Sequence, residues 1–377
     1  MKNILITGGA GFIGSNLALA LLKIGHKITV LDNLTPQIHG ENPDETSPLY
    51  NSIKNKVNFI NGTVTSKADW EKALKNQHVV VHLAAETGTG QSMYCIEKYT
   101  EVNILGTAIL LEILANSKHQ VTKIVIASSR AIYGEGKYKH PELGFVYPTH
   151  RNEKDMLASN FEVKYKGFSD LELVGTNEES KIHPSSVYGI TKQNQEQMIM
   201  TVCPTIDIAP VAFRYQNVYG PGQSLSNPYT GILSIFSTQI RNGNGIQIFE
   251  DGKETRDFVY IDDVVRATIL GIEKEEANGE VFNVGTGIAT DVLTVANTLI
   301  NAYGIEVPVK ISGRFRLGDI RHNFADMSKI KQFLKYEPKI LFKEGIHNFA
   351  KWVLEQKIEK DNLSNSLEEM KQKGLLK

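Results

Sequence analysis

The chain has 377 residues and a formal net charge of −1, with 41 lysine and arginine residues against 42 aspartate and glutamate residues. Because the charges balance and no long run of like charge occurs, neither nucleic acid nor an anionic membrane surface is indicated as a partner. No segment approaches the length of a membrane span, and the first apolar residues are interrupted by glycines, so no signal peptide is expected. Two cysteines, Cys95 and Cys203, form no metal-ligand pattern, so we expect no metal site, and free thiols fit a reducing cytoplasm.

The first expected elements are a strand over residues 3–7 and a helix over 12–24, joined by a glycine-rich turn. The turn reads Gly8-Gly-Ala-Gly11-Phe-Ile-Gly14. In such a turn Gly8 permits the tight bend, Gly11 lets the backbone approach a pyrophosphate, and Gly14 lets the helix pack closely on the sheet. The helix N-terminus would offer free amides and a partial positive charge to the phosphates. The pattern predicts a dinucleotide site.

A second apolar segment, residues 27–32, ends in Asp32, eighteen residues after Gly14. An acid at this point hydrogen-bonds the ribose hydroxyls of the adenosine, and its charge disfavours a 2′-phosphate. NAD is therefore favoured over NADP. The alternative is a glycine turn with a solvated aspartate at a strand end, but the order strand, turn, helix, strand and acid favours the cofactor site.

Apolar, β-rich segments recur along the chain with helical patterns between them. The strand-like segments are 3–7, 27–32, 57–61, 78–83, 122–128 and 207–214, and the helical patterns include 12–24, 101–116 and 188–200. Alternation of this kind predicts an α/β fold, a doubly wound parallel sheet of Rossmann type with helices on both faces. Shorter units at 246–249, 257–261 and 281–284 predict a smaller C-terminal substrate-binding part.

We therefore expect three regions: a mainly NAD-binding Rossmann domain (1–214), a mainly substrate-binding part (215–355) and a charged C-terminal tail (356–377). The tail is expected to be a solvated helix or a frayed end. Within the first region, residues 137–184 form a long polar insertion. A segment of that length is often a lid or a binding loop, and a tolerated surface excursion is the other interpretation. The sequence leaves both open.

Tyr188-Gly-Ile-Thr-Lys192 lies at the start of the helical pattern 188–200. On a helix, side chains four residues apart lie on the same face. A free tyrosine has a pKa of roughly 10 and is a poor base, but a nearby ammonium favours the phenolate and lowers that pKa. Many surface helices carry such a pair, so the interpretation as base and activator depends on the dinucleotide turn that accompanies it.

These motifs, with His82-Leu-Ala-Ala85 and Ser128-Ser129, resemble the extended short-chain dehydrogenase/reductases. More narrowly, they resemble the NAD-dependent nucleotide-sugar epimerase/dehydratase family, from residue 1 to about 355. Further segments agree, namely Arg214-Tyr-Gln-Asn217-Val-Tyr-Gly-Pro-Gly222, Phe249-Glu-Asp-Gly-Lys-Glu-Thr-Arg256-Asp-Phe, Phe282-Asn-Val-Gly-Thr-Gly287 and Leu317-Gly-Asp-Ile-Arg321-His-Asn-Phe-Ala-Asp326.

The resemblance implies that Ser129, Tyr188 and Lys192 are catalytic. In the family's pattern the tyrosine takes a proton from a sugar hydroxyl while the carbon's hydride passes to NAD. The lysine lowers the tyrosine's pKa and reaches the nicotinamide ribose, and Ser129, or its neighbour Ser128, hydrogen-bonds the reacting oxygen. The implied NAD contacts are Gly8, Gly11, Phe12, Ile13, Gly14, Asp32, Asn33, Thr63, Val64, Leu83, Ala84, Ala85, Asn103, Tyr188 and Lys192.

A sugar that must turn over during the reaction can hold few tight contacts, so binding energy is expected on the nucleotide diphosphate. Arginine suits that task because its forked guanidinium makes charge-assisted bonds to phosphate oxygens. The substrate-binding candidates are Ser129, Tyr188, Asn217, Arg256, Arg316 and Arg321. For any single arginine, a solvated or ion-paired surface role is the alternative.

Two segments, residues 85–94 and 222–231, resemble a narrower group, the dTDP-L-rhamnose 4-epimerases, which interconvert dTDP-L-rhamnose and dTDP-6-deoxy-L-talose. Two departures concern the cofactor, and a third leaves the exact sugar open. Thr63 replaces the acid that relatives place near the adenine, and Gln216 replaces a common phenylalanine. The insertion lacks a Cys-x-x-Cys pair that relatives can carry there.

Other members of the family are the main alternatives. A 4,6-dehydratase needs an Asp-Glu pair directly after the residue matching Ser129, and this chain has Arg130-Ala131. That difference favours an epimerase over a dehydratase; a decarboxylase of a UDP-uronic acid and a non-catalytic protein are further alternatives. Family members commonly dimerise through two helices per subunit, here about 93–116 and 188–202, so a homodimer is expected.

Overall fold

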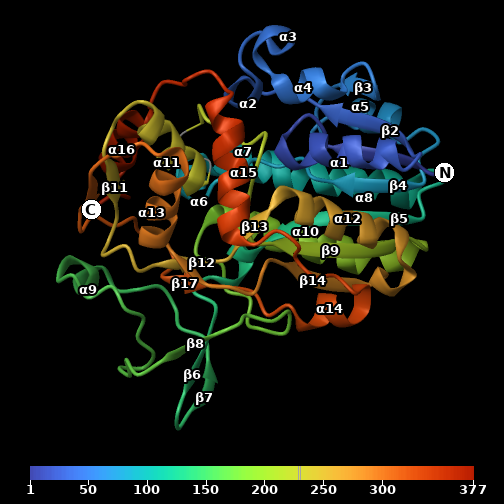
Figure 1. The fold of residues 1–377 in the computed structure, drawn as a ribbon. Coiled ribbons are helices and arrows are strands. Elements are labelled where there is room, and N and C mark those ends of the chain that lie inside the picture. Colours follow the sequence, from blue (N-terminus) through green and yellow to red (C-terminus); the bar gives the residue numbers. More distant parts are fainter. Residues whose placement is uncertain (228, 230) are drawn as a thin grey trace.

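Seven parallel strands form the central sheet of the computed structural model, in the order β14-β9-β5-β4-β1-β2-β3 (Figure 1). The model describes residues 1–227, 229 and 231–377, so Pro228 and Thr230 of the 222–231 motif lie outside the described residues. The predicted doubly wound parallel sheet is confirmed. Its strands are β1 (Asn3–Thr7), β2 (Lys27–Asp32), β3 (Asn58–Asn61), β4 (Val79–His82), β5 (Lys123–Ser129), β9 (Ala209–Tyr215) and β14 (Glu280–Val284).

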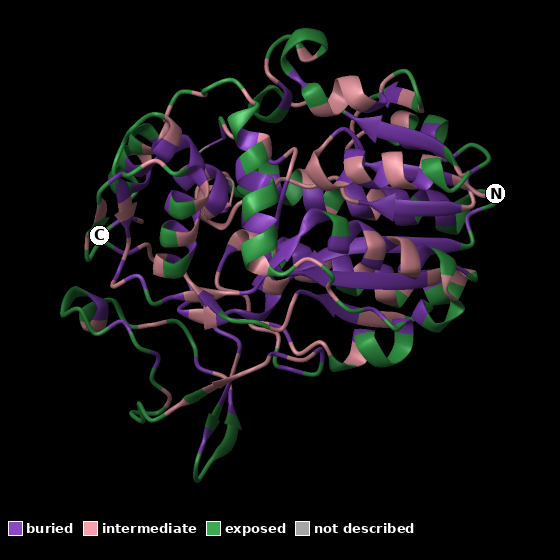
Figure 2. Ribbon diagram, viewed as in Figure 1, coloured by how far each residue is buried: buried purple, intermediate pink, exposed green. Residues whose placement is uncertain are grey.

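Helices cover both faces of this sheet because alternate strand residues point to opposite sides. Ile4 and Ile6 belong to the core that packs with α1 and α12, whereas Leu5 between them belongs to the core that packs with α5, α8 and α10. In Figure 2 most of the central strands are buried along nearly their whole length, whereas the edge strand β3 is largely exposed. The helices that cover the two faces of the sheet are α1 (Phe12–Lys23), α5 (Lys67–Ala73), α8 (Gly106–Asn116), α10 (Val187–Val202) and α12 (Ile261–Glu273).

The chain after residue 214 returns to this sheet. Helix α12 packs on α1, and β14 pairs with β9 to form the sheet edge. The division at residue 214 stays a prediction. Helix α12 and strand β14 come after residue 214 in the sequence but pack with the predicted NAD-binding region. The predicted helix over 101–116 begins with a π-helical segment, η1 (Thr100–Leu105), and continues as α8.

The rest of the chain after residue 215 builds small sheets and helices beside the carboxyl ends of the central strands (Figure 1). Its strands are β10 (Asn217–Tyr219), β11 (Ile246–Ile248), β12 (Thr255–Arg256), β13 (Phe258–Tyr260), β15 (Thr290–Asp291), β16 (Val309–Ile311) and β17 (His322–Asn323). Its helices are α11 (Ile232–Arg241), α13 (Val292–Tyr303) and α15 (Phe342–Leu354), whereas η4 (Glu275–Ala277) and α14 (Ser328–Leu334) pack against β14 of the central sheet. Shorter helices in the first region are α2 (Pro36–His39), α3 (Pro43–Thr46), α4 (Pro48–Ile53), α6 (Thr89–Ser92), α7 (Ile96–Tyr99), η2 (Arg130–Tyr133) and η3 (Cys203–Ile206).

The polar insertion, residues 137–184, has its own three-stranded antiparallel sheet. It contains β6 (Lys137–His140), β7 (Gly144–Val146), α9 (Glu153–Leu157) and β8 (Glu172–Val174), and its hairpin projects from the molecule (Figure 1). Several contacts tie its base to the C-terminal part, and two of them show the pattern. Arg151 forms a two-pronged bond with Glu250, at 2.7 Å for both contacts, and the Thr176 amide donates to the Phe324 carbonyl at 2.9 Å.

The C-terminal tail differs from the expectation of a solvated or frayed end. It forms α16 (Leu363–Gln372), which buries Leu367 and Met370, and Leu376 after the helix is also buried. Apolar residues at helical spacing give this otherwise charged helix one packing face. The tail then pairs with the chain around Arg316, where the amides of Phe315 and Lys377 exchange hydrogen bonds.

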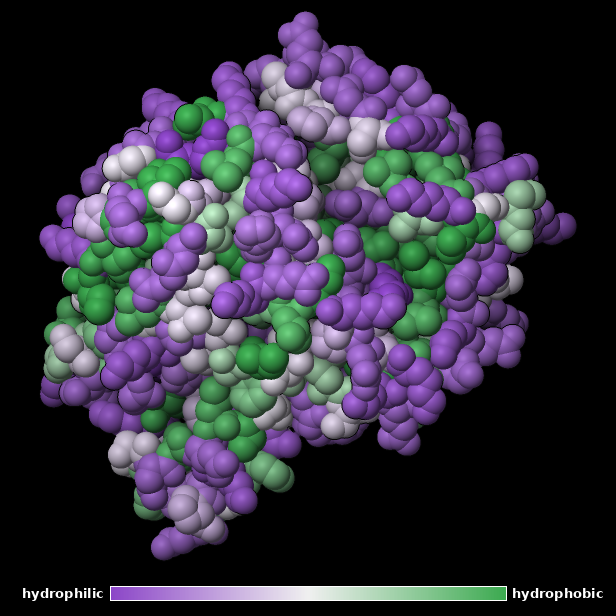
Figure 3. Space-filling view, viewed as in Figure 1, coloured by the Kyte–Doolittle hydropathy of each residue, from purple (hydrophilic) through white to green (hydrophobic). Residues whose placement is uncertain are grey.

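Hydrophilic side chains cover most of the face in Figure 3, with hydrophobic groups in small patches between them. Among the described residues, none of the helices combines the length and the apolar character needed to cross a membrane.

Candidate active site

The glycine-rich turn leaves room for a ligand at the start of α1. A side chain at Gly14 would place its Cβ 2.4 Å from the Gly8 carbonyl oxygen, and Gly8 itself has a φ of +66°. The amides of Phe12, Ile13 and Gly14 make no hydrogen bond within the described chain, as is usual for the first turn of a helix. Free amides facing a turn without side chains fit the pyrophosphate of a dinucleotide.

Asp32 fixes the same turn from the end of β2. Its Oδ2 accepts the Ala10 amide at 2.9 Å, its Oδ1 accepts the Leu34 amide at 2.9 Å, and His39 Nε2 lies 3.8 Å from Oδ1. A carboxylate has about four acceptor sites, so capacity remains for ribose hydroxyls. Neighbouring Asn33 is exposed and accepts from the Thr35 hydroxyl.

A carboxylate from α5 lies beside the segment after β3, where Thr63 replaces the acid of relatives. Asp69, from α5, accepts the Thr63 amide at 3.0 Å, and an added Cβ at Gly62 would lie 2.8 Å from its Oδ2. The Thr63 hydroxyl lies 2.9 Å from the Thr65 hydroxyl, and Val64 is buried. A carboxylate therefore stands beside this segment, although the local sequence does not show it.

The loop after β4 is held by Asn103 of η1. The Asn103 side chain accepts the Glu86 amide at 2.8 Å and donates to the Glu86 carbonyl and to the Thr191 hydroxyl. Because these bonds use its buried amide group, Asn103 acts by placing the loop Leu83-Ala84-Ala85 against α10. The Ala84 amide in turn donates to the Thr7 hydroxyl at 3.2 Å.

Tyr188 and Ser129 meet where β5 and α10 come together. The Tyr188 amide donates to the Ser92 hydroxyl at 3.0 Å, which anchors the start of α10. The Ser129 hydroxyl accepts the Ala131 amide at 3.1 Å and lies close enough to the Tyr188 phenol to lower its pKa, whereas the buried Ser128 hydroxyl has no partner in the described chain. Of the two serines, the geometry thus brings Ser129 to the tyrosine.

Two opposing influences act on the Tyr188 pKa. Burial raises the pKa, and the Ser129 hydrogen bond and the charge of Arg130 lower it. The Lys192 ammonium donates to the Gln195 side-chain oxygen at 2.6 Å, and Gln195 donates to the Thr107 hydroxyl at 2.9 Å. Burial lowers the pKa of Lys192 to about 7, against the opposing charge of Glu196. Gln195 was not foreseen from the sequence and holds the lysine within a buried polar network.

The predicted arginines have different surroundings. Arg256 donates to the backbone carbonyls of Thr255, Ile320 and Arg321, and no described carboxylate lies within ion-pair distance of it. Arg316 pairs with Asp319 at 2.7 Å and lies over the Phe249 ring.

Arg321 is fully buried, with no exposed area. Its guanidinium bonds Glu162, Glu250 and Asp251 at distances between 2.5 and 3.1 Å. This arrangement favours the ion-paired role over the substrate-binding role that the sequence predicts for Arg321. The carboxylates of Glu250, Asp251 and Glu254 lie close to one another, and each of them forms an ion pair with Arg321.

Asn217 and Gln216 lie at the carboxyl end of β9. The Asn217 side-chain oxygen accepts from Arg130 Nε at 3.1 Å. Gln216 is buried, and neither its amide nitrogen nor its amide oxygen has a partner in the described chain. Buried amides normally find partners, so a ligand or water is expected beside Gln216 when the site is filled.

The C-terminal tail reaches this region as well. A small cavity is lined by residues preceding α10, by the loop at Arg316 and by the tail, namely Thr89, Gly90, Met93, Ser185, Ser186, Arg316, Leu317, Gly318, Asp319, Met370 and Leu375. The Tyr94 hydroxyl donates to the Tyr229 hydroxyl at 3.1 Å, and Tyr229 donates to Glu369 of α16. No local motif predicted these contacts.

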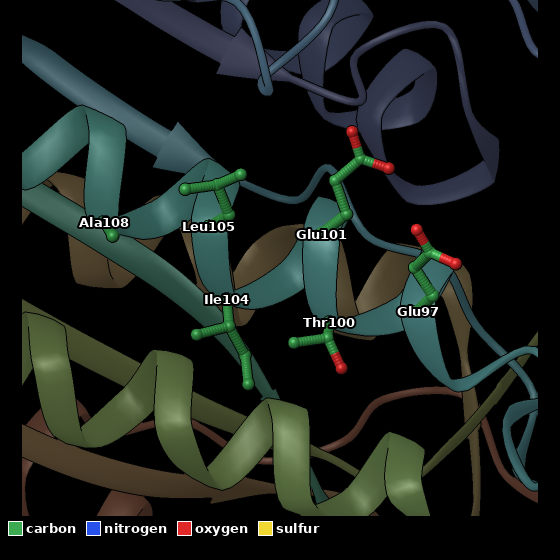
Figure 4. A pocket seen from close by; sticks show the side chains of 6 residues that line it. All are labelled: Glu97, Thr100, Glu101, Ile104, Leu105 and Ala108. Atoms are coloured by element: carbon green, nitrogen blue, oxygen red, sulfur yellow. The ribbon is translucent and has the colours of Figure 1, made fainter.

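A second hollow lies on the outer face of α7, η1 and α8, away from Tyr188. Figure 4 shows its lining of Glu97, Thr100, Glu101, Ile104, Leu105 and Ala108. It contains none of the predicted cofactor or substrate residues.

The glycine turn, the acid after β2 and the Ser/Tyr/Lys set together define an NAD-dependent enzyme of the short-chain dehydrogenase/reductase class. A family model described as the NAD dependent epimerase/dehydratase family matches residues 4–153 and 168–285. The chain belongs to this family.

Named relatives act on different sugars. The chain is 36% identical over 357 residues to a dTDP-L-rhamnose 4-epimerase of Burkholderia thailandensis, covering 94% of this chain and 96% of the relative. It is 30% identical over 352 residues to a putative UDP-glucose 4-epimerase of Methanocaldococcus jannaschii, covering 93% and 98%. A solved UDP-glucuronic acid 4-epimerase from Bacillus cereus, in complex with UDP-glucuronic acid and NAD, is similar with a TM-score of 0.76 at 26% identity, covering 93% of this chain and 99% of that one.

Proposed function

We propose that this enzyme is a nucleotide-sugar 4-epimerase and that it interconverts dTDP-L-rhamnose and dTDP-6-deoxy-L-talose. The observation that carries the reaction type is the proximity of Ser129 to Tyr188, together with Arg130 and Ala131 at the two positions after Ser129. These residues provide a base and its hydrogen-bond partner without the acid pair that elimination of water requires. The relative at 36% identity supports the choice of sugar.

In this proposal Tyr188 removes the proton from the 4-hydroxyl of the sugar and later returns it. Ser129 hydrogen-bonds the same oxygen, and Lys192 stabilises the phenolate through its charge. Bound NAD supplies a hydride acceptor, and the residues that would hold it are those of the glycine turn and Asp32. Arg256 and Asn217 would bind the diphosphate, so that the sugar is free to turn between the two proton transfers.

The test is incubation of the purified protein with dTDP-, UDP-, GDP- and CDP-sugars, followed by NMR of the sugar ring. Exchange of dTDP-L-rhamnose with its C4 epimer is the expected result. Net formation of a 4-keto-6-deoxy sugar would establish a dehydratase instead, and turnover of only another nucleotide sugar would overturn the choice of substrate. Tyr188→Phe should abolish turnover while NAD stays bound; substantial residual turnover would remove Tyr188 from the mechanism.

We further propose that two copies of the chain associate through residues 93–116, which include α7, η1 and α8, and through residues 188–202 of α10. Leu105, beside the hollow in Figure 4, and Ile190 on α10 are about half exposed, as is Ile96 on α7. Exposed apolar side chains that gather on one face suit an interface. Light scattering after size-exclusion chromatography should give twice the 41.9 kDa mass of one chain, and a monomer at micromolar concentration would contradict this proposal.

A further inference from the structure

Arg130 stands at the point of the fold where ligands of open parallel sheets bind. It is the first residue of η2, directly after Ser129 at the carboxyl end of the central strand β5. The carboxyl ends of such strands form the binding crevice of doubly wound sheets. The residue at this position is a positively charged arginine, whereas a dehydratase would need an acidic residue there.

Among the described residues no carboxylate lies within 4.0 Å of the Arg130 guanidinium, and Asp319 and Glu135 act on its charge only from farther away. Arg130 is half buried and makes no ion pair with a carboxylate within 4.0 Å, whereas Arg151, Arg214, Arg316 and Arg321 all do. A partly buried charge is costly unless it is paired. A guanidinium without an ion pair, placed next to Ser129 at the end of a strand, suits an anion supplied by a ligand.

A second arginine without an ion pair, Arg256, lies close to Arg130. It too lacks a carboxylate partner, and its charge, together with burial, lowers the pKa of Arg130 to about 9, which leaves the guanidinium charged at neutral pH. Two like charges without a counterion repel each other. An anion that contacts both guanidiniums removes that repulsion.

The remaining contact of Arg130 orients a third donor. Its Nε donates to Asn217 Oδ1, and its two terminal nitrogens make no hydrogen bond within the described chain. Because the Asn217 oxygen is engaged, the Asn217 amide nitrogen is the group left to donate to a ligand. Arg130 therefore offers a fork of free donors and places a neighbouring amide for the same ligand.

We propose that Arg130 is a substrate-binding residue, which with Arg256 and Asn217 holds the phosphate next to the sugar and also stabilises the Tyr188 phenolate. This inference rests on the proposed function, since it assumes a nucleotide-sugar substrate, but it does not depend on which sugar is turned over. The Lys192 ammonium is held by Gln195 and does not alone provide the positive charge near the Tyr188 phenol. In this proposal Arg130 provides the additional charge.

The binding test compares wild type, Arg130→Gln and Arg130→Lys in calorimetric titrations of the NAD-loaded enzyme with dTDP, UDP and thymidine. Loss of a charge-assisted bond should weaken dTDP binding about 10- to 100-fold. Arg130→Lys should recover part of that loss, and the affinity for thymidine, which has no phosphate, should not change. Arg314→Gln is the matched control, because it removes the same charge from an exposed side chain. Unchanged dTDP binding in Arg130→Gln, or a wild type that binds neither diphosphate, would overturn the inference.

The second readout is the pH profile of kcat. Without the Arg130 charge the phenolate is less favoured, so the acidic limb should move to higher pH by about one unit in Arg130→Gln. A limb at the wild-type pH would remove Arg130 from the activation of Tyr188. If the enzyme does not turn over dTDP-L-rhamnose but Arg130→Gln still weakens diphosphate binding, the proposed sugar fails and this inference stands.

Discussion

A buried ion pair fixes the helix that carries Tyr188 and Lys192, and Glu196→Gln tests its contribution. The Glu196 carboxylate receives two bonds from Arg214 on β9, at 2.6 and 3.0 Å, and both side chains are only 5% exposed. The substitution keeps the size of the side chain but leaves the guanidinium buried without its counterion. Breaking one partner of a buried pair costs about 3–5 kcal/mol.

The lower end of that range applies here because Arg214 keeps its bonds to the Tyr133 hydroxyl and the Glu178 carbonyl. We therefore expect a loss of about 3 kcal/mol, a large part of the 5–15 kcal/mol typical of folded proteins. With a urea dependence of about 3 kcal/mol per molar, the unfolding midpoint should fall by about 1 M.

The assay is equilibrium unfolding in urea, followed by circular dichroism, with saturating NAD in every sample. Asp44→Asn is the control, because Asp44 forms an exposed ion pair with Lys54 and such pairs contribute little. Its midpoint should match wild type. A loss below about 1 kcal/mol for Glu196→Gln would refute the reasoning, since it would mean that Arg214 finds water or another anion in place of Glu196.

Two further outcomes follow from the site. In protein stripped of NAD, the stability of wild type relative to Lys192→Met should rise by about 1.4 kcal/mol per pH unit between pH 7 and 9. The reason is that burial lowers the pKa of Lys192 in the folded protein to about 7, so between pH 7 and 9 only the unfolded chain carries this proton. A stability difference between the two proteins that does not change with pH, measured by urea titration, would contradict this expectation. Gly14→Ala should lose co-purifying NAD, measured by chromatography after denaturation, because the new Cβ would lie 2.4 Å from the Gly8 carbonyl oxygen. A full complement of NAD in that variant would show that the turn can widen without cost.

Local patterns were sufficient to predict six of the seven central strands and the glycine turn, but they assigned the edge strand β14 to the substrate-binding part. The strand 3–7, the glycines and Asp32 are adjacent in sequence, and each element is determined by its own periodicity and turn residues. The surroundings of Arg321 could not be predicted in this way, because its partners Glu162 and Glu250 lie 159 and 71 residues away along the chain. Asp69 beside Thr63 was missed for a related reason, since only the folded backbone brings it to the Thr63 amide.

The C-terminal tail shows a different reason for error. Its composition is highly charged, which indicated a solvated segment, but Leu367 and Met370 share one helix face and find a partner surface near Tyr229. Sequence alone does not show whether a partner surface exists. The geometry of Ser129 and Tyr188, by contrast, follows from a sheet topology that the sequence did predict.

The return of α12 and β14 to the central sheet has a consequence for protein engineering. A chimera that exchanged everything after residue 214 for the matching part of a relative would replace the edge strand of the sheet and a helix that packs on α1. Such a chimera would have to repack the nucleotide-binding core as well as the sugar site. An exchange that retains residues 261–285 from the recipient keeps this edge strand and this helix, so substrate preference is better transplanted as two separate segments than as one.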